Sequence, residues 1–144
     1  MVQMKKALII YHSKTGTTKK YGFAIRDFLL CQGIEAKAIP IQNFVPEDLN
    51  NTEIILLGCW TSGLFIMMQH PDKEWVEFAQ KLPDLNVKKI GLFTTYKLLT
   101  GSMFASMNKH LKTKSAKIGL TLKSRSINLS EQNKLKLKTF VQLD

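Results

Sequence analysis

The order of apolar and polar positions along the chain predicts alternating strands and helices. Nearly continuous apolar runs, typical of strands buried in a parallel sheet, lie at 5–11 and 53–58. Further strands are expected at 34–41, 88–95 and 116–122. Amphipathic helical patterns lie at 17–32, at 71–82 and after positions 102 and 130. This alternation predicts an α/β fold, a three-layer α/β/α sandwich whose five-stranded parallel sheet has helices on both faces.

Residues that favour helix ends place the helices more closely. Gly33 ends the first helix, and Pro71 is expected in the first turn of the second. Ser102 is expected to cap a third helix whose apolar face reaches Leu111, and Ser130 to cap the last. Ligands of such sheets bind beyond the carboxyl ends of the strands, where the strand order reverses. The loops at 12–18, 58–70 and 94–102 are therefore the place to look for function.

The first of these loops suits a phosphate group. The hydroxyls of Ser13, Thr15, Thr17 and Thr18 surround Gly16 between a strand and a helix. Backbone N–H groups and the helix dipole attract anions there, and the glycine allows close approach. Helix capping is a competing explanation for one or two of the hydroxyls, but four around one glycine favour phosphate binding.

Other phosphate-binding motifs do not fit this loop. The glycines of a Walker loop and of a dinucleotide fingerprint are absent, because Gly16 is the only glycine before Gly22. The loop holds no thiol for a cysteine-dependent phosphatase. His12, Ser13 and Cys59 occupy the strand ends where a response regulator carries acidic residues.

Composition predicts one soluble domain. The 144 residues are 44% hydrophobic, which is enough for a full core, and no linker or repeat divides 1–144. No apolar run approaches the roughly 18 residues of a membrane span, so no transmembrane segment is expected. Cys31 and Cys59 are too few for a disulfide framework or a metal cluster. We therefore expect a cytoplasmic protein with reduced thiols.

The net charge of +10 is unevenly distributed. Acidic residues gather between Glu47 and Asp84, whereas the first 20 residues and the chain beyond 108 are strongly basic. Such a balance favours acidic partners, an anionic cofactor, nucleic acid or a membrane surface, although solvated lysines explain charge equally well. Nucleic acid is not expected, because the basic residues do not alternate with aromatic residues in a recognisable module.

The segment "IIYHSKTGTTKKYGFAI" resembles the signature of the flavodoxin family, and the order of elements extends the resemblance over the whole chain. Ile9, Ile10, Tyr11, Ser13, Gly16, Thr18 and Ile25 match the signature. Gly22 replaces the alanine that the family usually has. The resemblance implies a short-chain, flavodoxin-like domain that binds FMN.

The resemblance also assigns residues to the cofactor. The phosphate would be held by Ser13, Lys14, Thr15, Gly16, Thr17 and Thr18. The flavin ring would lie between two loops. One contains Trp60, Thr61, Ser62 and Gly63, and the other contains Thr94, Thr95 and Tyr96. Trp60 lies slightly earlier than the family's stacking aromatic, so packing in the core or at its rim is an equal alternative. Lys97 gives the second loop a cationic character, which predicts a less negative potential than in acidic carriers.

Three functions are compatible with these features. An FMN-binding carrier would pass electrons between a reductase and an acceptor protein with an acidic docking face. An FMN-dependent oxidoreductase would act on a small acceptor such as a quinone, with the apolar segment 64–68 lining its pocket. A flavin-free domain would only bind a partner. The resemblance favours the carrier, and the sequence leaves it open whether the protein is an enzyme.

Overall fold

The computed structural model describes residues 5–61, 70–86, 88–97, 100–114 and 116–142. Five parallel strands form one sheet: β1 (Lys6–His12), β2 (Glu35–Pro40), β3 (Ile54–Trp60), β4 (Lys89–Thr95) and β5 (Ile118–Ser124). They are ordered β2-β1-β3-β4-β5, so the order reverses between β1 and β3. The predicted five-stranded parallel sheet is confirmed.

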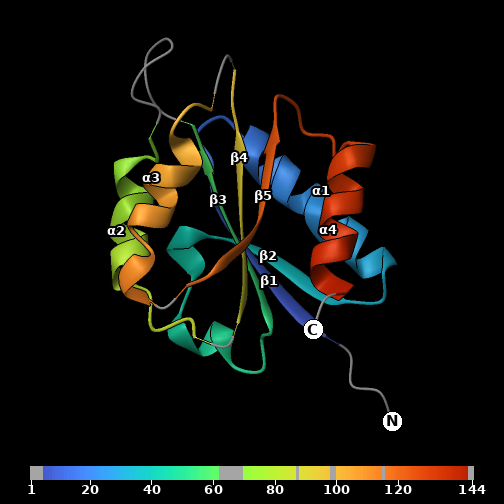
Figure 1. Cartoon of the computed structure of the whole chain (residues 1–144), viewed down its shortest axis with the longest axis horizontal. Helices are drawn as coiled ribbons and strands as arrows, with labels where there is room; N and C mark the ends of the chain where they lie inside the picture. The colour runs from blue at the N-terminus through green and yellow to red at the C-terminus, as the bar shows by residue number, and fades with distance from the viewer. Residues whose placement is uncertain (1–4, 62–69, 87, 98–99, 115, 143–144) are drawn as a thin grey trace.

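Helices cover both faces of the sheet, as the sequence predicted (Figure 1). The helices α1 (Thr17–Cys31) and α4 (Glu131–Gln142) lie on one face, and α2 (Lys73–Lys81) and α3 (Met103–Lys109) lie on the other. Short 3₁₀ turns lie at Ile41–Asn43, Pro46–Leu49 and Lys112–Lys114. None of the helices in the described part of the chain is long and apolar enough for a membrane crossing.

Alternate residues of the strands pack into two separate hydrophobic cores, because successive side chains in a strand point to opposite faces of the sheet. Leu8 and Ile10 of β1 pack toward Trp75 of α2, whereas Ala7 and Ile9 pack toward α1 and α4. The continuous apolar runs in the sequence reflect this burial on both faces.

Several element ends differ from the sequence expectations. The third strand continues past Gly58 to Trp60, because Trp60 pairs with Thr95 of β4. Pro71 precedes α2, and Asp72 is its N-cap, with a carboxylate that accepts the Glu74 N–H at 3.1 Å. In the structure, the end of β3 and the start of α2 both lie at the carboxyl edge of the sheet.

The predictions for the N-caps of the last two helices differ in outcome. Ser102 is the N-cap residue of α3, as predicted, but its side chain makes no capping hydrogen bond. A turn closed from Met103 N–H to Thr100 O precedes the helix instead. Leu111 is buried but follows the end of that helix. Ser130 does cap the last helix, since its Oγ accepts the Asn133 N–H at 3.1 Å.

Candidate functional site

The hydroxyl loop (13–17) connects β1 to α1 at the point where the strand order reverses. Gly16 has a φ of 97°, in the left-handed region that favours glycine. Beyond its chain neighbours, a Cβ at Gly16 would meet no heavy atom within 4 Å, so the backbone is open to close approach. The Gly16 amide donates to Ser13 Oγ at 3.0 Å, and α1 begins at Thr17. The loop therefore presents a compact turn at the positive end of a helix dipole.

The hydroxyls of this region divide into two sets. Thr15 is exposed and Thr17 is half-buried, and among the described residues their side chains make no hydrogen bond. Thr18 is only 1% exposed, and its Oγ1 lies 2.6 Å from Thr95 Oγ1. Thr15 and Thr17 thus have hydroxyls available to a ligand, whereas the Thr18 hydroxyl ties α1 to the end of β4.

Thr18 belongs to a threonine cluster, which we define as Thr18, Thr61, Thr94 and Thr95. Thr94 Oγ1 donates to the Cys59 carbonyl at 2.6 Å and lies 2.7 Å from Thr61 Oγ1. The Thr61 N–H donates to the Thr95 carbonyl at 2.9 Å. The sequence predicted Thr61, Thr94 and Thr95 near the cofactor, and the structure brings them together at the carboxyl ends of β3 and β4.

Each of the two aromatic residues predicted to face a flavin has a cation over its ring. Lys14 Nζ lies 4.9 Å from the ring centre of Trp60, and the Arg125 guanidinium lies 5.5 Å from that of Tyr96. Both rings are half-buried, and Trp60 also packs against the core on the side of α2. These cation–π contacts could not be predicted from the sequence, because their partners are far apart in the chain. Ser62, Gly63 and the apolar segment 64–68 lie outside the described residues.

Three exposed cationic side chains lie at this edge of the sheet. We define the cationic rim as Lys14, Lys97 and Arg125, which are exposed in the three loops that follow β1, β4 and β5. Other lysines bind backbone carbonyls, as Lys5 does to Val141 O and Lys88 to Thr52 O. Part of the net charge therefore supports the fold, whereas the rim residues carry exposed positive charge at this edge of the sheet.

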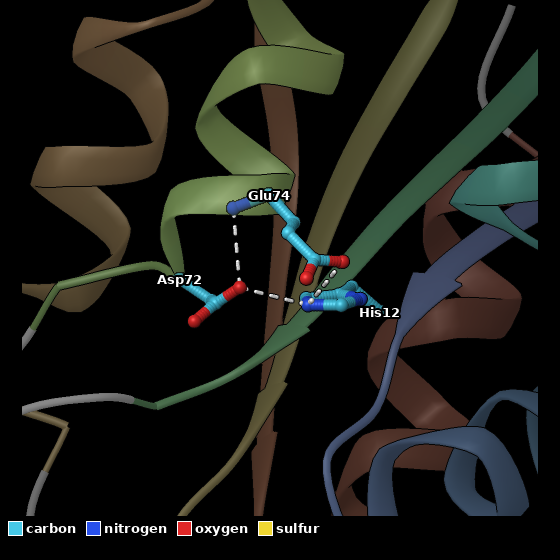
Figure 2. Close-up of side chains that lie close together, drawn as sticks. All are labelled: His12, Asp72 and Glu74. Carbon is cyan, nitrogen blue, oxygen red and sulfur yellow. Dashed lines mark hydrogen bonds and ion pairs between the residues drawn. The ribbon is translucent and has the colours of Figure 1, made fainter.

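His12 has an acidic partner that the sequence did not reveal. Its Nε2 lies 2.9 Å from Asp72 Oδ2, 60 positions away along the chain. Figure 2 shows His12 and Asp72 together with Glu74, from the first turn of α2. Cys59, the register partner of His12 in β3, is buried, and burial raises the pKa of its thiol to about 12. The Cys59 thiol therefore stays protonated at neutral pH, and a protonated thiol is a poor nucleophile.

Comparisons with known proteins relate the whole arrangement to one family. A family model described as "Flavodoxin domain" matches residues 8–124. Flavodoxin from Megasphaera elsdenii is 29% identical over 90 residues, which are 61% of this chain and 63% of that protein. The alignment thus spans less than two thirds of that relative's length.

Solved structures share the fold. The two-electron reduced flavodoxin of Megasphaera elsdenii superposes with a TM-score of 0.71 at 22% identity, over 93% of this chain and 94% of that one. Oxidised Flavodoxin 2 from Bacillus cereus superposes with a TM-score of 0.69 at 22% identity, over 94% of each chain. A short-chain flavodoxin associated with a bacterial microcompartment superposes with a TM-score of 0.72 at 18% identity, over 96% of this chain and 95% of that one.

Proposed function

The chain belongs to the flavodoxin family, whose cofactor is FMN, and from this premise we propose that it binds FMN and carries electrons between two proteins. The observation that carries this proposal is the hydroxyl loop itself. Gly16 leaves the backbone open, Thr15 and Thr17 keep their hydroxyls unengaged, and the loop lies at the start of α1. These are the features by which a loop binds a terminal phosphate.

The residues of the site take distinct roles in this proposal. The phosphate is held by Ser13, Lys14, Thr15, Gly16, Thr17 and Thr18. Thr18 acts through its backbone and through its bond to Thr95, which fixes the start of α1 against β4. The flavin ring is flanked by the segments 60–63 and 94–96. FMN supplies the electron-accepting chemistry, and the chain binds, orients and shields it.

The cationic rim supports an acidic redox partner. Lys14, Lys97 and Arg125 are exposed at the edge of the sheet where the cofactor would lie. Complementary charge accelerates the encounter of two proteins, and salt weakens this effect. Electron transfer to an acidic partner should therefore slow as ionic strength rises, and replacing Lys97 and Arg125, the two rim residues not assigned to the phosphate, by Gln should weaken this salt dependence. A rate that is independent of salt in both proteins would contradict the acidic docking face.

We also infer a cytoplasmic location from the two thiols. Cys31 is exposed and Cys59 is buried, and both are free. Free thiols persist in the reducing environment of the cytoplasm.

The first experiment is a titration of FMN into the purified protein, followed by flavin fluorescence. We expect quenching with one FMN per chain. The Thr15→Ala substitution removes a donor to a charged phosphate, and a bond of this type is worth about 1.5–3 kcal/mol, so affinity should fall roughly 10- to 100-fold.

Thr139→Ala is the matched control, because Thr139 is also an exposed threonine but lies on α4. It should bind FMN like the unmodified protein. If the folded protein binds no FMN, the proposed function is wrong. If Thr15→Ala binds as tightly as the control, the phosphate lies elsewhere.

A further inference from the structure

Three side chains with metal-binding atoms meet beside the hydroxyl loop, on the face of the sheet covered by α2. His12 ends β1, Asp72 is the N-cap of α2, and Glu74 lies in its first turn. His12 Nε2 is 2.9 Å from Asp72 Oδ2 and 3.9 Å from Glu74 Oε2, and the three ligand atoms all lie within 4.8 Å of one another. In Figure 2, dashed lines join both carboxylates to the same nitrogen of the imidazole ring.

These spacings suit a tetrahedral metal ion. Zinc binds imidazole nitrogen and carboxylate oxygen at about 2.0–2.2 Å, so the ligand atoms of a tetrahedral site lie roughly 3.3 Å apart. The distances of 2.9 Å and 3.9 Å from His12 Nε2 to the two carboxylates bracket that value. For one ion to be bound by all three groups, the Glu74 carboxylate has to move closer to His12 Nε2.

The surrounding structure holds two of the ligands and leaves the third adaptable. His12 is fixed by the pairing of β1 with β3, where it lies opposite Cys59. Asp72 is oriented by the Glu74 N–H, which donates to its Oδ2 at 3.1 Å. The Glu74 side chain is 65% exposed, compared with 11% for His12. Glu74 can therefore close onto an ion, and water can occupy the remaining coordination position.

The charges and the ligand types select the class of metal. The first turn of α2 carries a partial positive charge that opposes a cation, but the two carboxylates together neutralise a divalent ion. Imidazole favours zinc and similar transition metals, whereas magnesium and calcium prefer sites made of oxygen alone. The donor set of one imidazole and two carboxylates therefore favours a zinc-type ion over magnesium or calcium.

We propose that His12, Asp72 and Glu74 form a binding site for a divalent transition-metal ion of the zinc type. The site uses none of the residues assigned to FMN, so it does not depend on the proposed electron-transfer function. Because His12 directly precedes Ser13, a bound ion would also anchor the start of the hydroxyl loop to α2.

The test is a calorimetric titration of Zn²⁺ into the full chain after treatment with a chelator, in the presence and absence of excess Mg²⁺. We expect one Zn²⁺ per chain and no competition by Mg²⁺. Loss of an outer-shell partner alone weakens metal sites about 10- to 100-fold, so Glu74→Gln and Asp72→Asn should each weaken binding at least tenfold.

The variants are chosen to keep the fold. Glu74 is exposed, and Asn caps a helix about as well as Asp, so both substitutions should leave α2 intact. Glu77→Gln is the matched control, since Glu77 is an exposed acid on the same helix. The His12 ring signals in an NMR spectrum should shift when Zn²⁺ is added.

Three outcomes would overturn the proposal. They are the absence of Zn²⁺ binding, equal weakening by Glu77→Gln and Glu74→Gln, and binding that leaves the His12 signals unchanged. Displacement of Zn²⁺ by equimolar Mg²⁺ would overturn the assigned metal class.

Discussion

Two groups of hydroxyl side chains meet at the carboxyl edge of the sheet, the hydroxyl loop and the threonine cluster, and they differ in what they bind. Thr15 and Thr17 of the loop make no side-chain hydrogen bond within the described residues. In the cluster, Thr94 and Thr18 bond to other threonines at 2.7 and 2.6 Å. Among the described residues, the same chemical group thus has no protein partner in one region and holds elements of the fold together in the other.

The difference follows from burial. A buried hydroxyl without a partner costs about 1–3 kcal/mol, so the threonines between β3, β4 and α1 have to pair with one another. An exposed hydroxyl bonds to water at little cost and can exchange that water for a phosphate oxygen. Substitutions in the cluster should therefore reduce stability, and substitutions in the loop should reduce FMN binding.

Thr94→Val should have the largest effect on stability. Valine has the shape of threonine, but it removes the donor to the Cys59 carbonyl and the partner of Thr61. Because Thr94 is fully buried, the free energy of unfolding should fall by about 1–3 kcal/mol, measured by urea denaturation. Thr121→Val in β5 is the control, since that residue is exposed. Equal losses in the two variants would contradict the role of the cluster.

Gly16→Ala should come next, and it tests the backbone of the loop. The left-handed conformation at Gly16 costs a residue with a Cβ about 1–2 kcal/mol, although space for the methyl group is available. We expect that loss in urea denaturation together with weaker FMN binding. Unchanged stability would show that the loop adopts another conformation in solution.

Thr18→Val distinguishes the role of the hydroxyl loop from that of the threonine cluster. Thr18 matches the flavodoxin signature in the sequence, but in the structure it belongs to the threonine cluster. The substitution removes the hydrogen bond to Thr95 and leaves the buried Thr95 hydroxyl without that partner, so the free energy of unfolding should fall by about 1–2 kcal/mol. FMN affinity, compared at a temperature where the variant is fully folded, should fall less than for Thr15→Ala. A larger loss of affinity would mean that the Thr18 hydroxyl itself contacts the phosphate.

Thr17→Ala should have the smallest effect on folding. Its side chain has no hydrogen bond among the described residues, so the free energy of unfolding should change by less than about 0.5 kcal/mol. FMN affinity, measured by fluorescence quenching, should still fall. A loss of stability without a change in affinity would assign Thr17 to the fold instead.

The sequence by itself determined the fold and the position of the candidate site. The continuous apolar runs of β1 and β3 required burial on both faces, and parallel strands joined by helices place their loops at one edge. Gly16 and the hydroxyls around it mark this loop as the candidate for a phosphate, because both properties are local to a few consecutive residues.

Only the tertiary structure decided how the side chains pair. His12 and Asp72, Thr18 and Thr95, and Tyr96 and Arg125 are contacts between different elements. Whether a hydroxyl has a hydrogen-bond partner depends on its burial and on the loop ends that lie beside it in the fold. The spacing of residues along the chain shows neither of these. Sequence patterns thus fix which elements form, whereas three-dimensional packing fixes which of their polar groups remain available to a ligand.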